Sequence, residues 1–188
     1  PYIIWMSIFF LVVLVKGMYS FSEALPHYLT SLVYLHNATF LKYSYINPVA
    51  WSLEVEIQFY LLAPFLTWLF FRDKNVIRRR LMLIVAWAGM MFMQQSFGWL
   101  HYPYRLFILG HLHYFLLGFL LTDFYLSYWQ EERKMHRLWD VVGIASFALM
   151  PLTYSETGSN VIFTVCLGLL MASAFLGPLI NKWICNPW

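Results

Sequence analysis

The amino-acid sequence predicts an all-α protein, a polytopic bundle of six to seven transmembrane helices. Of its 188 residues, 61% are hydrophobic and only 11% are charged, whereas about a quarter of a soluble domain is charged. The hydrophobic residues also gather in runs close to the roughly 20 residues that a helix needs to cross a bilayer. Because no strand alternation, repeat or linker interrupts these runs, we expect one membrane-embedded domain over residues 1–188.

The predicted helices follow one another along the whole chain. Five apolar runs are long enough to span a bilayer or are cut short by the chain end, at residues 1–15, 48–71, 81–97, 106–126 and 161–180. Residues 28–41 and 141–152 are shorter candidates, and the first of these contains His36 and Asn37. No Met or basic segment precedes the first run, so we expect no signal peptide. The chain is expected to begin inside a helix and to be a fragment truncated at both ends.

Positive charge orients the predicted bundle. Twelve of the 21 charged side chains lie in two clusters, at 72–80 and 131–140. Since short loops rich in Lys and Arg stay cytoplasmic, loops 72–80 and 130–138 are assigned to the inside, and the turns at 101–105 and 155–160 to the outside. The sequence therefore predicts a multi-pass membrane protein. The basic residues form no stripe or face, so nucleic-acid binding is disfavoured.

One helix carries unusual polar residues. Asn47 is a favourable N-cap and Pro48 suits the first helical position, so a helix is predicted to start there. Glu56 then lies about 12 Å below that start. A carboxylate at the helix centre costs about 2.5–3.5 kcal/mol, so Glu56 is expected to face the bundle interior or a water-filled cavity.

The neighbours of Glu56 divide between two helical faces. Ser52 and Tyr60, four residues before and after Glu56, are predicted to share its stripe. Glu54 falls on another face, nearer the surface, where a structural role is favoured. Two other interpretations stay open, namely that Glu56 is an interhelical hydrogen-bonding acid and that Trp51 is an interface anchor.

An eleven-residue window with nine fixed positions reads Trp51-Ser52-Leu53-x-Val55-Glu56-x-Gln58-Phe59-Tyr60-Leu61, followed by Pro64. This motif resembles the signature of the acyltransferase family 3 membrane proteins, which include bacterial polysaccharide O-acetyltransferases. The later stretch His111-Leu112-His113-Tyr114-Phe115-Leu116-Leu117-Gly118 is similar to a further helix of that family.

The resemblance implies a membrane-bound O-acyltransferase. It would transfer an acyl group, usually acetyl, from acyl-CoA to a hydroxyl of an extracytoplasmic glycan, a lipid-linked saccharide or a related acceptor, in the bacterial inner membrane. Acyl-CoA would be the donor substrate, with no tightly bound cofactor and no metal. Glu56 would be catalytic by orienting or polarising a partner, with hydrogen bonds from Ser52 and Tyr60, while Trp51 shapes the outer mouth of the transfer pore.

Family members also carry an Arg and a His on their first helix, and the His is favoured as the catalytic base. No position of this sequence matches that motif. We therefore expect the catalytic base upstream of Pro1 and do not transfer its role to His27 or His36.

Other polar residues have two interpretations each. His113 is a candidate to line the pore or a hydrogen-bonded bundle histidine, whereas His111 is interpreted as structural. Arg105 is a candidate for binding a polar acceptor, or it snorkels to the interface. The cluster at 78–80 is interpreted first as a determinant of topology. Its second interpretation is that it attracts anionic lipid or the phosphates of CoA.

Two other classes of function compete with acyl transfer. In a transporter or exporter, Glu56 and His113 would line a polar path, although an inverted-repeat transporter should show paired interrupted helices. In a purely structural membrane subunit, Glu56 would be replaceable without loss of activity.

Overall fold

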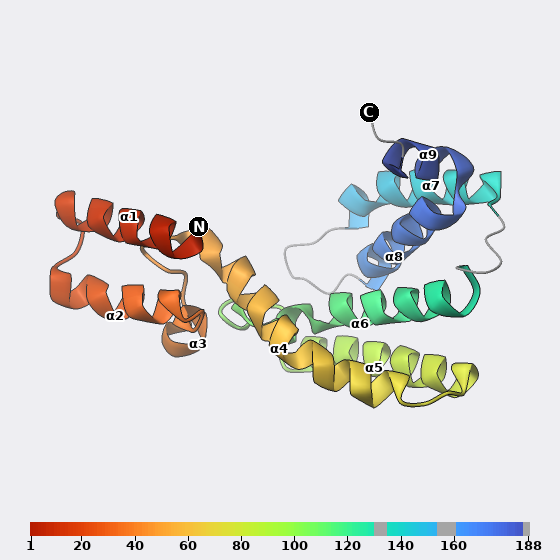
Figure 1. Ribbon diagram of the computed structural model, residues 1–188, viewed down its shortest axis with the longest axis horizontal. Coiled ribbons are helices and arrows are strands. Elements are labelled where there is room, and N and C mark those ends of the chain that lie inside the picture. The colour runs from red at the N-terminus through yellow and green to blue at the C-terminus, as the bar shows by residue number, and fades with distance from the viewer. Residues whose placement is uncertain (130–134, 154–160, 186–188) are drawn as a thin grey trace. The chain divides into compact units, whose positions relative to one another are not determined.

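A computed structural model describes residues 1–129, 135–153 and 161–185. Every regular element in these ranges is a helix and none is a strand, which confirms the predicted all-α class (Figure 1). The chain divides into two compact units. Unit 1 comprises residues 1–66 and 98–111, unit 2 comprises residues 67–97 and 112–188, and each is described by itself.

Unit 1 is built on a pair of neighbouring helices, α1 (Tyr2–Val15) and α2 (Phe21–Leu32). Gly17, with φ of 62°, allows the tight turn between them because it has no Cβ to clash in the left-handed region. Ser20 and Glu23 form a capping box that starts α2. The apolar faces enclose a small core of Met6, Phe10, Ala24 and Ile46.

The chain then breaks where a helix over residues 28–41 was predicted. Helix α2 ends at Leu32, Tyr34 adopts a left-handed φ of 58°, and a short helix α3 (His36–Phe40) follows. The prediction of one helix here is wrong, because polar side chains in the segment are held in buried contacts. His36 and Asn37 are almost fully buried.

The predicted start of the signature helix is confirmed. Asn47 accepts a hydrogen bond from the amide of Val49 at 3.2 Å and caps the 3₁₀ turn η1 (Pro48–Ala50). Helix α4 (Trp51–Phe71) continues directly from this turn, and it passes through Pro64 as one element.

Unit 2 contains the remaining long helices. They are α5 (Val76–Ser96), most of α6 (Ile108–Phe124) with the π-helical turn η3 (Tyr125–Trp129), α7 (Arg137–Thr153), α8 (Val161–Leu176) and α9 (Pro178–Cys185). A shorter turn, η2 (Tyr104–Leu106), precedes α6 and belongs to unit 1.

A buried carboxylate holds the bend between α8 and α9. The two helices meet at 85°, and Asp140 of α7 accepts hydrogen bonds from the amides of Leu179 at 3.1 Å and Ile180 at 3.0 Å. These amides would otherwise lack partners at the start of α9. Gly177 fits beside Asp140 because it has no side chain.

The start of α5 and the end of α6 lie together. Both Arg79 and Arg80 form ion pairs with Asp123, whose side chain is fully buried. This places the two helices antiparallel (Figure 1), as the predicted alternation of inside and outside loops requires. Much of loop 130–138 and all of the turn at 155–160 lie outside the described residues.

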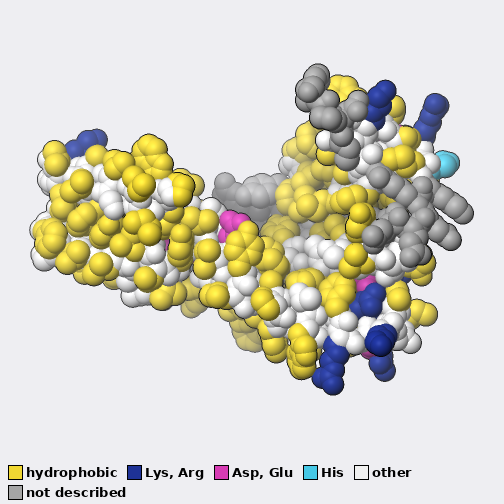
Figure 2. Space-filling model, in the orientation of Figure 1, with side chains coloured by type: hydrophobic (Ala, Val, Ile, Leu, Met, Phe, Trp, Pro, Cys, Tyr) yellow, Lys and Arg dark blue, Asp and Glu magenta, His cyan; other side chains and the backbone are white. Residues whose placement is uncertain are grey.

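Two helices of the described chain are long and apolar enough to cross a membrane. They are Pro48–Phe71 and Ile108–Tyr128, and the bent pair Val161–Leu176 and Pro178–Ile184 makes a third if it counts as one span. Helix α1 is apolar but shorter. These helices indicate a membrane protein, and hydrophobic side chains cover much of the visible surface (Figure 2). The predicted number of six to seven spans is not confirmed.

Candidate functional site

The exposed stripe of α4 is the first part of the candidate site. Ser52, Glu56 and Tyr60 are all exposed, which agrees with the prediction that they share one helical face. The Tyr60 hydroxyl donates a hydrogen bond to the Glu56 carboxylate, as predicted. Ser52 does not, because its hydroxyl donates instead to the Val49 carbonyl at 3.2 Å.

The predicted burial of the two glutamates is reversed. Glu56 is exposed in the part of the chain that the structure describes, whereas Glu54 is only 1% exposed. The Glu54 carboxylate accepts a hydrogen bond from the amide of Asn37 at 2.9 Å, at the start of α3. Amides at a helix start lack intrahelical partners and attract negative charge, so α3 gives Glu54 a buried position.

A second set of contacts joins the start of α4 to the first turn of α6. The Trp51 indole stacks on the His111 imidazole, with ring centroids 5.5 Å apart. The Nε2 of His111 lies 2.8 Å from the backbone carbonyl of Arg105. Since a carbonyl can only accept, Nε2 carries the proton of this hydrogen bond. His111 therefore has the structural role that was predicted, and its partner is a residue of the signature.

Arg105, whose carbonyl holds His111, is itself a predicted site residue. Its side chain is exposed, and its guanidinium donates to the Tyr43 hydroxyl at 3.1 Å. The structure thus gives Arg105 a partner within unit 1, and its predicted role in acceptor binding stays a prediction.

Gln58 has a role that sequence reasoning missed. Its side-chain oxygen accepts a hydrogen bond from the amide of Ile108 at 3.0 Å, the first residue of α6. The signature helix thus satisfies an amide at the start of α6. No local pattern indicates this contact, which joins residues 50 positions apart.

A buried histidine pair in unit 1 was also missed. The Nδ1 of His27 and the Nε2 of His36 are 2.8 Å apart, so one of them donates to the other. Burial, together with the nearby His27 and Lys42, lowers the pKa of His36 to about 4. Burial also lowers the pKa of His27. The two imidazoles are therefore held neutral at pH 7. The signal in the sequence that could have indicated this histidine pair was the presence of polar residues inside the predicted span 28–41.

His113 belongs to unit 2 and is only 1% exposed. Its ring centroid lies 3.9 Å from that of Tyr114. Burial of this kind fits the bundle-histidine alternative. The other candidates, Trp51, Ser52, Glu56, Tyr60 and Arg105, all belong to unit 1.

Comparison with known proteins assigns the family. The model of the acyltransferase domain family, acyltransferase 3, matches residues 1–188. Comparisons with curated proteins and with solved structures give no match. The family match favours acyl transfer over the transporter and the structural-subunit hypotheses. Over its whole length the chain belongs to acyltransferase family 3, and it is a transferase that moves acyl groups other than aminoacyl groups.

Proposed function

We propose that the protein transfers an acyl group, acetyl in the simplest case, from acyl-CoA to a hydroxyl of an extracytoplasmic glycan, a lipid-linked saccharide or a related acceptor. The observation that carries this proposal is the exposed pair of Glu56 and Tyr60 on a helix that bears the family signature. In this proposal residues 1–188 act as one membrane-embedded acyltransferase domain.

The reaction defines what the site must supply. The acceptor hydroxyl oxygen attacks the thioester carbonyl carbon, a C–O bond forms, and the C–S bond breaks. The proton of the hydroxyl leaves to a base and ends on the CoA thiolate. We propose that Glu56 accepts a hydrogen bond from the acceptor hydroxyl and orients it, because an ionised carboxylate is an acceptor with several lone pairs. Tyr60, which already donates to Glu56, would hold the carboxylate in place.

Trp51 and Arg105 complete the proposed acceptor side. The Trp51 ring, fixed on His111, would shape the outer mouth of the transfer pore. Arg105 would bind a polar acceptor from the same side, since its carbonyl anchors His111 and its side chain is exposed. Ser52 would line the mouth beside Glu56.

The proposed topology has six crossing helices, α1, α4, α5, α6, α7 and α8, in the plasma membrane. Loops 72–80 and 130–138 would be cytoplasmic, where acyl-CoA is available, and the start of α4 would face outward. The ion pairs between the start of α5 and the end of α6 support this order, because they place both ends on the same side.

Sealed membrane vesicles test donor, acceptor and sidedness together. Inside-out and right-side-out vesicles that contain the full-length protein would receive acetyl-CoA labelled on the acetyl group, and the glycan fraction would then be counted. We expect label in the glycan only when the donor is on the cytoplasmic face. Label that appears only with the donor on the other face would contradict the topology. Label that enters protein but no saccharide would contradict the acceptor.

A further inference from the structure

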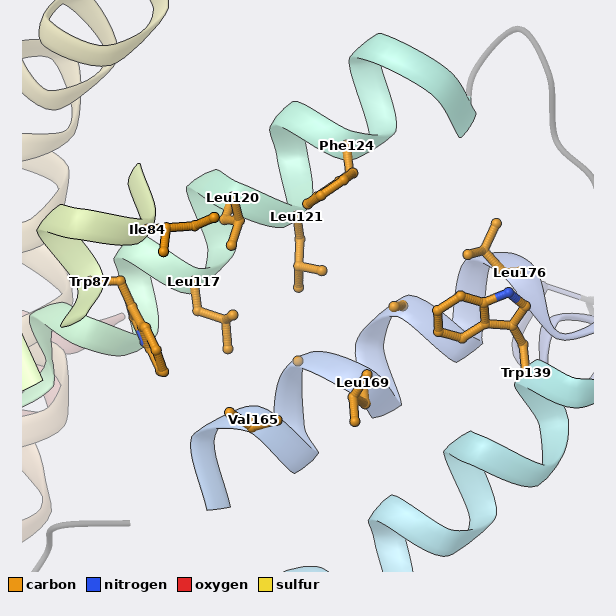
Figure 3. A pocket seen from close by; sticks show the side chains of 12 residues that line it. Ile84, Trp87, Leu117, Leu120, Leu121, Phe124, Trp139, Val165, Leu169 and Leu176 are labelled. Carbon is orange, nitrogen blue, oxygen red and sulfur yellow. The ribbon is translucent and has the colours of Figure 1, made fainter. Parts of the chain in front are cut away.

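An apolar cavity lies within unit 2, among α5, α6, α7 and α8. Its volume is about 430 Å³, and every residue that lines it is apolar. In Figure 3, Ile84, Leu117 and Leu121 face Val165 and Leu169 across the space. This volume falls within the range of about 300–1,000 Å³ that is typical of ligand sites.

A glycine keeps one wall of the cavity open. A Cβ atom at Gly168 would lie 3.1 Å from the Leu117 side chain, which also lines the cavity. The cavity extends along α6 from Leu117 to Phe124, about 10 Å of helix rise. Its shape is therefore an elongated apolar space beside a helix, bounded at one end by Phe124 (Figure 3).

Positive charge lies at the Phe124 end. The guanidinium carbon of Arg80 is 4.0 Å from the centre of the Phe124 ring and 4.6 Å from that of Tyr128. Its Nε donates to Asp123 at 2.6 Å. The Phe124 ring thus contacts the Arg80 cation and also lines the apolar cavity.

The charges of the described residues at this end do not balance. Within that part of the chain, Arg79 and Arg80 both pair with one carboxylate, that of Asp123, which leaves one surplus positive charge in the pairing. Arg79 also donates to the Ser127 hydroxyl at 3.2 Å and to the Asp73 carbonyl at 3.1 Å. On Arg80, by contrast, the buried Nη2 has no acceptor among the described residues.

The Arg80 side chain is largely desolvated but not fully enclosed. It keeps 16% of its surface exposed, whereas its Nη2 atom is buried. A desolvated charge is costly unless it is paired and hydrogen-bonded. A phosphate suits this position, because the planar guanidinium offers several donors in a fixed geometry.

We propose that this cavity binds an acyl chain of an anionic phospholipid whose phosphate pairs with Arg80. A phosphodiester headgroup such as phosphatidylglycerol carries one negative charge, which matches the single surplus positive charge. CoA carries several phosphate charges and an adenine, and the entirely apolar lining offers them no partner. In the predicted topology this lipid lies in the cytoplasmic leaflet. The proposal is independent of the acceptor and of the role of Glu56.

Lipid-dependent stability of the purified full-length protein tests the proposal. The delipidated protein in detergent would be titrated with dioleoyl phosphatidylglycerol, dioleoyl phosphatidylcholine or acetyl-CoA. Thermal unfolding would give the melting temperature, and native mass spectrometry would give the amount of bound lipid. We expect phosphatidylglycerol to bind at least about tenfold more tightly than phosphatidylcholine. A hydrogen bond to a charged group accounts for a difference in affinity of that size.

Three variants separate the charge from the cavity. Arg80→Gln should remove the preference for phosphatidylglycerol, while Asp123 keeps Arg79 as a partner. Arg78→Gln is the matched control, because Arg78 is 70% exposed and pairs with Asp73. Leu169→Trp should fill the cavity and weaken both lipids. Leu169 is itself 38% exposed, so the larger ring has room.

Several results would overturn the proposal. Equal binding of both lipids by the unaltered protein would remove the role of Arg80, as would an unchanged preference in Arg80→Gln. Displacement of phosphatidylglycerol by acetyl-CoA in an Arg80-dependent manner would assign the site to the donor. If Arg80→Gln unfolds, native mass spectra of Arg80→Lys test the role of Arg80 instead. Arg80→Lys should still bind phosphatidylglycerol, but more weakly than the unaltered protein does. Undiminished binding in Arg80→Lys and Leu169→Trp would contradict the site.

Discussion

The Trp51 indole stacks on the His111 imidazole, with centroids 5.5 Å apart and planes inclined by 30°. This contact fixes the first residue of α4 against the first turn of α6. His111 is fixed in turn by the Arg105 carbonyl. The signature tryptophan is thus positioned by a residue 60 places later in the chain.

Replacement of His111 should separate its ring contact from its hydrogen bond. His111→Phe keeps an aromatic partner for Trp51 and is expected to retain most acyl transfer. His111→Ala loses both contacts and should lower stability by about 1–2 kcal/mol, since an aromatic pair contributes roughly 0.5–1.5 kcal/mol and a hydrogen bond about 1 kcal/mol. Thermal unfolding and acyl transfer by the full-length variants measure the two effects. Equal loss in both variants would contradict a role of the stacking.

Replacement of Glu54 should affect folding. In Glu54→Gln the side chain loses its charge at the start of α3, and a buried amide replaces the carboxylate. We expect a loss of about 1–3 kcal/mol in the free energy of unfolding. The exposed Glu56→Gln should change the melting temperature little. A variant of Glu54 with unaltered stability would show that the contact with Asn37 contributes nothing.

Acidic pH should destabilise unit 1 through His36. Its pKa of about 4 in the folded protein is below the ordinary value of 6.5. Between these values the unfolded chain binds the proton and the folded chain does not, so stability is lost as pH falls from about 6.5 to 4. Between pH 6.5 and 5 the loss should be about 2 kcal/mol, because one pKa unit corresponds to about 1.4 kcal/mol.

Melting temperatures at pH 7.5 and 5 measure this loss. His36→Asn should flatten the difference between the two pH values, whereas replacement of the exposed His101 by Gln should leave it unchanged. His27 and Lys42 surround His36 and stay in place in both variants. The explanation fails if His36→Asn keeps the full pH dependence.

Two glycines should respond oppositely to alanine. A Cβ at Gly143 would lie 2.6 Å from Ile180 and 2.8 Å from the Cβ of Ser173, so Gly143→Ala should cost about 1–3 kcal/mol by overpacking. Nothing lies within 4 Å of a Cβ at Gly89, and Gly89→Ala should stabilise α5 by up to about 1 kcal/mol. Thermal unfolding distinguishes them, and equal effects would contradict the close packing of α7 and α8.

Local rules predicted the parts of the fold that depend on nearby residues. The all-α class followed from composition, and the start of the signature helix followed from Asn47 and Pro48. The stripe of Ser52, Glu56 and Tyr60 followed from helical spacing. The helix start and the stripe each depend on residues within about two turns of one another.

Burial could not be predicted in the same way, because it depends on contacts between distant segments. Helical position alone suggested that Glu56 is buried and Glu54 lies nearer the surface. The structure reverses them, since the amide of Asn37, 17 residues earlier, is the partner of Glu54. The hydrogen bond between Gln58 and Ile108 and the histidine pair of unit 1 were missed for the same reason.

The most direct test of the central claim compares Glu56→Gln with Glu23→Gln in the full-length protein. Both residues are exposed glutamates that accept a hydrogen bond from a hydroxyl, Tyr60 or Ser20. Transfer of labelled acetyl from acetyl-CoA to glycan would be measured in membranes with equal amounts of each protein. We predict a loss of roughly 100-fold or more for Glu56→Gln, the size seen when one polar group that stabilises a transition state is removed, and unchanged transfer for Glu23→Gln. Full transfer by a stably folded Glu56→Gln protein would contradict the role of Glu56 in acyl transfer.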